Sequence, residues 1–358
     1  MRTNFNTYSD ENEDGSVTVV KKARRALTTY EDIGEAAFGE FGRSLISWVL
    51  YAELIGTCGL FFILEGDHLK LLFESTMSQS KETLMLLAAG VMIPTTWLVD
   101  LSKLSLIGAL GFVASVGLTG VVGWDLIQAL TNPSGYEFPH TALVHYSTYP
   151  LSFGLLAFVF AGHAVFPAIY TSMQKPEEYE SMLDKTYGVV MINCLLLGCA
   201  GYFLFGDQVS SEVTLDLPAG IISTIALGLI TINPLAKFAL TMDPVARGVE
   251  EKFNLDTSKA ENLLPARVSR TGLGLFALGL AVKLPFFGVA MSLVGAVLTL
   301  SVSLIFPTAC YLKMFGDELD AKEKWLNYAI VGIGFLCVGS GTYSAIAALI
   351  DTSSDFGM

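Results

Sequence analysis

The segment from Pro150 to Pro176 is apolar over a length that can cross a bilayer, but the pair Gly162–His163 and Pro167 interrupt it. Lipid offers no hydrogen bonds to a polypeptide backbone. Irregular backbone at membrane depth is therefore found where protein buries it or where it lines a cavity. We expect this segment to form a broken helix that contributes to a substrate site.

The composition predicts an integral membrane protein. Of the 358 residues, 52% are hydrophobic and 15% are charged, and the mean hydropathy is +0.55, which is too apolar for a soluble domain to cover with polar surface. The formal net charge of −13 argues against nucleic acid as a partner, because phosphate binding needs clustered Lys and Arg. The fold class that follows is all-α.

Apolar stretches near the bilayer-crossing length of roughly 20 residues recur along the chain and predict about nine transmembrane helices, two of them short. The predicted spans are Ser44–Leu64, Leu84–Val99, Leu104–Trp124, Pro150–Tyr170, Tyr187–Phe205, Pro218–Leu240, Thr271–Leu284, Gly288–Leu312 and Trp325–Ile350. They define a membrane domain over residues 41–350, between a polar N-terminal tail over residues 1–40 and a short C-terminal tail over residues 351–358.

Charge asymmetry between the loops predicts the orientation. When the loops are assigned alternately to two sides, all of the 21 Lys and Arg residues except Lys70, Lys81 and Lys283 fall on one side. Cytosolic loops carry the excess of positive charge, so the N-terminus is predicted to be cytosolic and the C-terminus lumenal. The cytosolic loop over residues 243–270 contains DPVARGVEEKF, which is expected to form a short amphipathic helix at the membrane surface.

Two ionisable residues are predicted to lie deep within the spans. Glu53 lies about halfway along the first span, and His163 lies in the broken segment. Such groups are costly in hydrocarbon and often mark proton or ion pathways, so both are candidates for proton coupling. Each also has a structural interpretation, Glu53 as a hydrogen-bond acceptor and His163 as a histidine satisfied within the bundle.

The predicted substrate site centres on the break and takes two weaker candidates from the apolar segment LITINPLAK. Its residues are Phe160, Ala161, Gly162, His163, Thr231 and Asn233. Polar residues such as the last two more often form interhelical hydrogen bonds. The five cysteines lie in apolar spans without metal-ligand spacing, and no nucleophile–base pair or cofactor fingerprint is present. We expect no catalytic residue, no metal and no cofactor.

Four stretches of the sequence resemble the amino acid/auxin permease family. They are TYEDIGEAAFGEFGR (residues 29–43), FILEGDHLKLLF (62–73), GLLAFVFAGHAVFPAIYTSMQKPEEY (154–179) and NPLAKFALTMDPVARGVEE (233–251). The sequence GHAVFP with its downstream MxxP is the most specific of them. Within the family, the likeness is strongest to fungal vacuolar amino acid transporters and the related vesicular inhibitory amino acid transporters.

The resemblance implies a LeuT-like fold, in which two inverted five-helix repeats and an extra helix hold the substrate between two broken helices. Residues 150–170 match the sixth helix of that fold, in agreement with the break deduced above. On the same register residues 44–64 are the third helix, and the first two are absent. We therefore expect an N-terminally truncated member that transports poorly or not at all by itself. Either two further helices are encoded upstream or the gene is a degraded copy.

The leading hypothesis is a proton-coupled secondary transporter of neutral amino acids in a vacuolar or similar endomembrane. Its partners would be an amino acid, protons and the lipid bilayer, and sodium coupling is the open alternative within transport. The alternative from another class is a non-transporting remnant or a regulatory membrane protein of the same family. An enzyme is not expected.

Overall fold

A computed structural model gives the fold of the chain. It describes residues 7–11, 17–21, 27, 29–73, 79–97, 104–132, 136–142, 144–146, 149–163, 166–218, 220–257, 259–283 and 286–355. Within the segment predicted as a polar tail, β1 (Thr7–Glu11) pairs antiparallel with β2 (Val17–Lys21), with Ser9 opposite Val19. The other regular elements in these ranges are helical.

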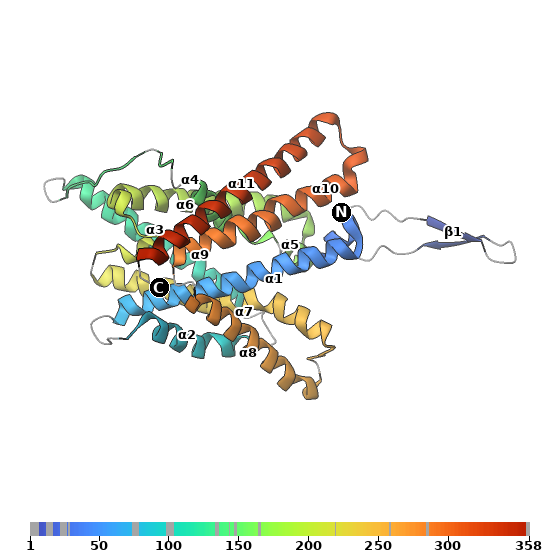
Figure 1. Ribbon diagram of the computed structural model, residues 1–358, viewed down its shortest axis with the longest axis horizontal. Helices are drawn as coiled ribbons and strands as arrows, with labels where there is room; N and C mark the ends of the chain where they lie inside the picture. Colours follow the sequence, from blue (N-terminus) through green and yellow to red (C-terminus); the bar gives the residue numbers. More distant parts are fainter. Residues whose placement is uncertain are drawn as a thin grey trace.

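The helices follow one another along the chain and form an elongated bundle (Figure 1). They are α1 (Tyr30–Phe73), α2 (Lys81–Thr95), α3 (Leu104–Thr131), α4 (Tyr149–Val159), α5 (Phe166–Ser172), α6 (Tyr179–Phe205), α7 (Ile221–Lys252), α8 (Ala260–Lys283), α9 (Phe287–Leu293), α10 (Phe306–Phe315) and α11 (Ala321–Asp355). Short 3-10 turns, η3 (Pro176–Glu178), η4 (Gly206–Gln208), η5 (Val213–Leu215) and η8 (Gly316–Glu318), lie between them. Two π-helical segments, η6 (Val294–Thr299) and η7 (Ser301–Ile305), join α9 to α10.

Each predicted span overlaps a helix or a run of consecutive helical segments. Six segments within the described ranges are long and apolar enough to cross a membrane: α1, residues 111–131 of α3, residues 176–208 with α6, α7, residues 287–318 with α9 and α10, and residues 321–350 of α11. Helix α4 is apolar but short, since the predicted span over residues 150–170 is divided. The total of about nine crossings stays a prediction.

Helix α1 begins well before the first predicted span and bends at Gly39, where φ is 67° and ψ is −159°. Before the bend, Tyr30 and Ala37 are buried against Ile46 and Leu50 of the same helix. The Tyr30 hydroxyl donates a hydrogen bond to the Val302 carbonyl of η7. The predicted boundary at residues 40 and 41 falls next to this bend and stays a prediction.

The main core lies where α1, α2, α7 and α8 meet. Phe62 of α1 and Phe238 of α7 are fully buried there, with ring centroids 5.0 Å apart. Gly59 of α1 faces the backbone of α8, and a Cβ at this position would lie 3.4 Å from the Ala277 carbonyl oxygen, an ordinary contact distance. Close packing of small residues of this kind is what holds helices together in lipid, where burial of apolar surface gives little driving force.

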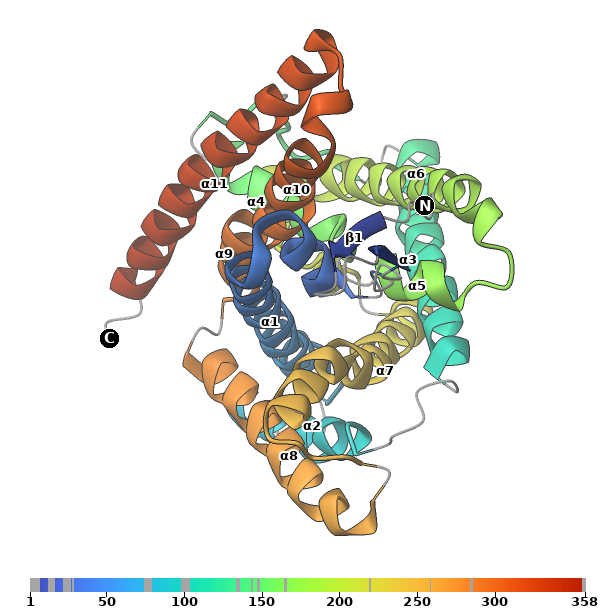
Figure 2. The ribbon, with the colours of Figure 1, turned by 90° about the vertical axis from the view of Figure 1, so that its right-hand side faces the viewer.

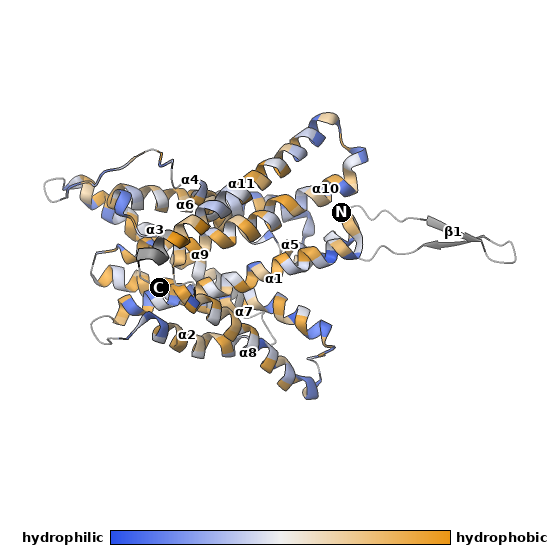
Figure 3. Ribbon diagram, in the orientation of Figure 1, coloured by the Kyte–Doolittle hydropathy of each residue, from blue (hydrophilic) through white to orange (hydrophobic). Residues whose placement is uncertain are grey.

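The outward faces of the bundle are apolar. Seen along the helices, α2, α8 and α11 lie outside α1, α7 and α10 (Figure 2). Hydrophobic residues occupy most of the length of the helices, and hydrophilic residues gather towards the helix ends (Figure 3). Outward-facing residues include Trp48, Leu87, Leu195 and Leu336, which are 72%, 56%, 59% and 73% exposed. This distribution suits contact with lipid.

The predicted amphipathic helix in the loop over residues 243–270 is wrong. Helix α7 continues without interruption to Lys252, so DPVARGVEEKF forms its last turns. The reason is visible in the burial pattern, since Val245 and Ala246 are 2% and 0% exposed and pack in the protein. The connection to α8 is short, because α8 begins at Ala260.

A buried ion-pair network joins α7, α8 and the end of α2. Arg270 of α8 is 5% exposed, and its Nε and Nη2 donate to the two Glu250 carboxylate oxygens at 2.7 and 3.2 Å. Its Nη1 donates to the Thr96 carbonyl at 2.8 Å and to Asp243 at 3.2 Å. Asp243 also accepts from Arg247 at 2.5 Å. The bidentate pair with Glu250 and the further acceptors compensate the cost of burying the Arg270 charge.

We predict that Arg270→Leu lowers the free energy of unfolding by about 3–5 kcal/mol, because Glu250 would keep a buried charge without its partner. Thermal unfolding of the purified protein in detergent measures the effect. The exposed Arg267 gives a matched control, since Arg267→Leu should stay within about 0.5 kcal/mol of the native chain. Equal losses in the two variants would show that the network contributes no stability.

Candidate functional site

The predicted break in the helix over residues 150–170 is present. Helix α4 ends at Val159 and α5 begins at Phe166. The chain leaves α4 through two tightened turns, in which the amides of Phe160 and Ala161 donate to the carbonyls of Ala157 and Phe158 at 3.2 and 3.1 Å. Gly162 follows with φ at +122°, a conformation that residues with a side chain rarely adopt.

The backbone of the break is open to its surroundings. Ala161 and Gly162 are exposed, and nothing lies within 4 Å of the position that a Cβ on Gly162 would take. The tightened turns satisfy the Ala157 and Phe158 carbonyls near the end of α4, and the exposed peptide groups follow them. The break therefore offers peptide groups that a polar ligand can reach.

An aromatic cluster surrounds His163. Its ring centroid lies 4.8 Å from that of Phe166 and 6.2 Å from that of Tyr187 on α6. The Tyr187 hydroxyl is 3.4 Å from His163 Nε2, and Phe160 stacks on Tyr187 at 6.0 Å. His163 Nδ1 is buried without a hydrogen-bond partner. The imidazole thus retains one nitrogen that is free to bind a proton or a polar group.

Small residues fix α4 against the helix that follows α8. The Ser292 hydroxyl of α9 donates to the Leu151 carbonyl at 2.9 Å. A Cβ on Gly154 would lie 2.3 Å from the Ser292 carbonyl oxygen, and one on Gly295 of η6 would lie 1.9 Å from the Gly154 carbonyl oxygen. No side chain fits at either glycine. The start of the broken helix is therefore held by backbone contact with α9 and η6.

Glu53 binds the same π-helical region. It is 5% exposed, and its Oε1 accepts a hydrogen bond of 2.6 Å from the Thr299 hydroxyl at the end of η6. Thr299 is fully buried. Segments of π-helix occur frequently at functional sites because the extra residue disturbs the regular hydrogen bonding. The structure does not bring Glu53 and His163 together, since their recorded partners lie on η6 and on α5 and α6, respectively.

The two weaker candidates on α7 face other elements. Thr231 is 7% exposed, donates to the Leu227 carbonyl at 2.8 Å and lines a cavity formed by residues of α1, α2 and α7. Asn233 packs against α3, where a Cβ on Gly111 would lie 2.5 Å from its Oδ1. That oxygen is buried without a partner. A role for either residue in substrate binding stays a prediction.

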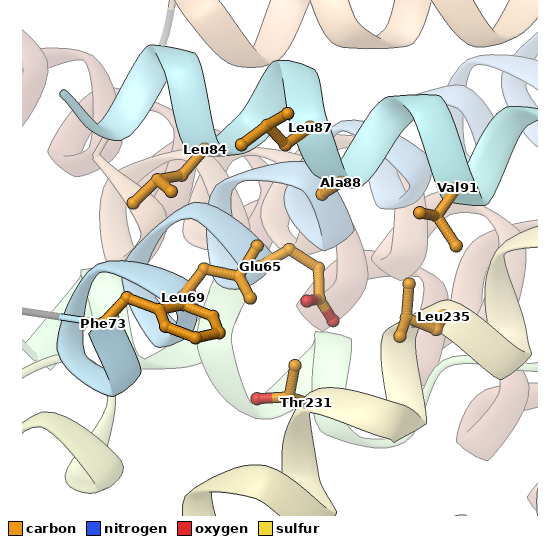
Figure 4. Close-up of a pocket in the computed structure, with 9 residues that line it drawn as sticks. All are labelled: Glu65, Leu69, Phe73, Leu84, Leu87, Ala88, Val91, Thr231 and Leu235. Carbon is orange, nitrogen blue, oxygen red and sulfur yellow. The ribbon is translucent and has the colours of Figure 1, made fainter. Parts of the chain in front are cut away.

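Two buried titratable residues in α1 escaped the sequence analysis. Glu65 and His68 are each 1% exposed, and Glu212 from the connection after α6 is 7% exposed beside them. Glu65 lines the cavity of about 240 Å³ that also holds Thr231 (Figure 4). The predicted span ends at Leu64, whereas α1 runs to Phe73. The spacing of EGDH, with acid and histidine three residues apart on one helical face, was the signal available.

Comparison with known proteins places these features in a family. The profile of the family described as transmembrane amino acid transporter protein matches residues 16–347. Over 333 residues the chain is 37% identical to amino acid transporter AVT1B of Arabidopsis thaliana, and the match covers 91% of this chain. Amino acid transporter AVT1C of the same plant is 36% identical, with the same coverage of this chain. The chain spans 61% and 60% of the lengths of these two relatives.

A third Arabidopsis thaliana relative, amino acid transporter AVT1I, is 32% identical over 344 residues, which are 93% of this chain and 83% of the relative. Among solved structures, a Na+-coupled sialic acid symporter in a substrate-bound outward-open state matches with a TM-score of 0.51. The match covers 89% of this chain and 77% of the symporter at 13% sequence identity, so it shows the fold alone. It confirms the predicted all-α, LeuT-like fold class.

We predict that Gly162→Ala lowers the free energy of unfolding by about 1–3 kcal/mol, because alanine does not adopt a φ of +122° without strain. Thermal unfolding in detergent is the measurement. Gly198 on α6 is the matched control, since nothing lies within 4 Å of its Cβ position and its helical backbone suits alanine. A Gly162→Ala variant as stable as Gly198→Ala would contradict the strained break.

Proposed function

Because this chain belongs to the family of transmembrane amino acid transporter proteins, we propose that it is a proton-coupled secondary transporter of neutral amino acids. The observation that carries the proposal is the break between α4 and α5, where exposed backbone at Ala161 and Gly162 lies beside His163. Several relatives are named as amino acid transporters, which supports this class of substrate.

The chemistry of an amino acid fits such a break. The zwitterion has a carboxylate that accepts hydrogen bonds and an ammonium group that donates them, and interrupted helices at membrane depth supply both kinds of peptide group. We assign the contacts to Phe160, Ala161, Gly162 and His163. The aromatic rings around His163 would pack against an apolar side chain. This surrounding supports a preference for neutral substrates.

Proton coupling is assigned to Glu53 and His163. Glu53 is buried with one recorded hydrogen bond, and His163 has a buried nitrogen without a partner. Groups of this kind change charge at a cost that depends on the conformation around them, which is the property that coupling needs. The contact of Glu53 with η6, which also fixes α4, would connect its protonation to the position of the break.

The location proposed is a vacuolar or similar endomembrane, with the N-terminus in the cytosol and the C-terminus in the lumen. The asymmetry of Lys and Arg between the two sides supports this orientation. In Figure 1 the start of α1 and the end of α11 lie towards opposite ends of the bundle, which fits an odd number of crossings. The family resemblance of the sequence supports the choice of membrane.

We predict that His163→Ala and Glu53→Gln abolish or uncouple proton-driven uptake, because each removes a group that changes protonation within the membrane. Uptake of labelled neutral amino acids into vesicles containing the chain is measured with and without a proton gradient. The exposed residues His140 and Glu137 give matched controls, and His140→Ala and Glu137→Gln should keep the native gradient dependence.

Native gradient dependence in both test variants would contradict the assignment of the coupling residues. Uptake that follows a sodium gradient in the absence of a proton gradient would contradict proton coupling while leaving transport in place. No saturable uptake under either gradient would contradict transport by this polypeptide and would favour the non-transporting or regulatory alternative.

The orientation makes a separate prediction. Cysteines placed at Glu137 and at Phe253, both exposed in loops or at a helix end, should react with an impermeant thiol reagent from opposite sides of the membrane. Glu137 is expected on the lumenal side and Phe253 on the cytosolic side. The native chain serves as the control for its own cysteines. Labelling of both positions from one side would contradict the orientation.

A further inference from the structure

Three titratable side chains gather at the end of α1 that is predicted to face the lumen. His68 Nε2 lies 3.6 Å from Glu212 Oε2 and 3.2 Å from the Thr214 hydroxyl oxygen of η5. Glu65 occurs three residues before His68, which places both side chains on one face of α1. Glu65, His68 and Glu212 are 1%, 1% and 7% exposed. We call these three residues the α1 cluster.

The α1 cluster is buried with few hydrogen bonds. Glu65 Oε1 and His68 Nδ1 have no hydrogen-bond partner, and Glu212 has the Asp67 carboxyl beside it. An anionic carboxylate in such a place is strongly disfavoured, so the acids bind protons unless a positive charge is close. This differs from Arg270 and Glu250, whose buried charges are fully paired.

Charged side chains beside the α1 cluster are more exposed than the cluster itself. Asp67 of α1 and Lys81 of α2 form an ion pair of 2.6 Å beside Glu212, and their side chains are 18% and 19% exposed. Asp216 accepts hydrogen bonds from the backbone and side chain of Ser210. Helix α8, which also packs on α1, places Lys283 at this end in an exposed position. The Asp67–Lys81 pair is thus the partly solvated edge of the cluster.

Glu65 connects the α1 cluster to a cavity within the bundle. The cavity of about 240 Å³ is lined by leucines and other apolar residues of α1, α2 and α7, with Thr231 contributing a hydroxyl. In Figure 4 the Glu65 carboxyl points into the space between these helices, towards Thr231 and Leu235. Among the described residues that line this cavity, Glu65 is the titratable one.

We propose that Glu65, His68 and Glu212 form a buried proton relay that carries protons between the lumenal side and the interior of the bundle. The proposal rests on the proposed proton-coupled transport and adds a proton path that is separate from Glu53 and His163. These three residues act on protons and do not contact the amino acid.

Each step of the relay moves one proton and breaks and forms one bond to hydrogen. The Glu212 carboxyl gives its proton to His68 Nε2 and becomes a carboxylate beside an imidazolium, at the 3.6 Å separation of the two atoms. Glu65 first gives its own proton to the interior of the bundle and becomes a carboxylate. The imidazolium then releases the proton on Nδ1 to this carboxylate and returns to its neutral form. The Thr214 hydroxyl bonds to Nε2 and orients the ring between transfers.

The surroundings of Glu212 set the pH at which the lumenal end of the relay titrates. Burial, together with the neighbouring Asp67 carboxyl and against the opposing charge of Lys81, raises the pKa of Glu212 to about 8. The folded protein therefore holds a proton on Glu212 over a range in which the unfolded chain has lost it. Stability from this group is present at acid pH and falls as the pH rises towards about 8.

A proton-binding measurement tests the relay without any transport. We expect Glu212→Gln to remove about one proton of the uptake that purified protein shows between about pH 6 and about pH 9, and to flatten the loss of thermal stability over that range. The control Glu137→Gln replaces an exposed acid on the same predicted side and should leave the proton binding over this range as it is in the native chain. Equal titration curves for the two variants above about pH 6 would overturn the proposal.

Transport in vesicles gives a second test of the relay. We expect Glu65→Gln and His68→Gln to reduce gradient-driven uptake by roughly tenfold or more while exchange of labelled for unlabelled amino acid, which needs no net proton movement, is kept. Loss of exchange together with driven uptake would mean a structural defect and would overturn the relay. If the native chain shows no gradient dependence, the proposed coupling fails, whereas the proton-binding result still decides whether these residues hold protons.

Discussion

The absence of hydrogen-bonding solvent in lipid is the constraint on which this structure depends. A continuous helix satisfies its own backbone, so the chain can cross a membrane in long apolar segments such as α7 and α11. The break between Val159 and Phe166 departs from that rule. It is possible because α4 is fixed by backbone contacts to α9 and η6, and because Gly162 adopts a conformation that residues with a side chain rarely adopt.

Buried charges obey the same constraint to different degrees. Arg270 meets two carboxylates and a carbonyl, which makes a stable joint between α7, α8 and the end of α2. Glu53 has a hydrogen bond from Thr299. Glu65 and His68 have buried atoms without partners, and Glu212 has the Asp67 carboxyl beside it. Full compensation favours a fixed charge, and incomplete compensation favours a group that changes protonation. We therefore assign Arg270 to the architecture and propose the other residues for proton handling.

Much of the fold could be predicted from the sequence because hydropathy and glycine placement act locally. The apolar stretches overlap the observed helices, and the interruption at Gly162 and His163 is where α4 ends. The ends of the helices were harder to predict than their positions along the chain. Leu64 appeared to close a span because EGDH is polar, but contacts with η5 and α2 bury those residues and let α1 continue to Phe73. Burial of residues within DPVARGVEEKF likewise lets α7 continue to Lys252.

The break could be predicted from the sequence, whereas the contacts of the other candidate residues could not. The residues of the break lie together in sequence, so their proximity needed no knowledge of packing. The other candidates meet residues from distant segments of the chain. Glu53 accepts a hydrogen bond from Thr299, Thr231 lines a cavity with Glu65, and Asn233 packs against Gly111. Hydropathy shows that a polar residue is inside a helix and does not show which neighbour it meets. Only the tertiary contacts show whether a polar residue within an apolar segment lies at the break or faces another helix.

The central claim is that the exposed backbone of the break holds the substrate, and protection of a single position tests it most directly. Ala161→Cys places a thiol at an exposed position of the break, and Gly198→Cys places one on the exposed face of α6 as the control. The rate of thiol modification is measured with and without a saturating neutral amino acid. We predict slower modification at position 161 with the amino acid and an unchanged rate at position 198. Equal rates at position 161 with and without the amino acid would contradict the account.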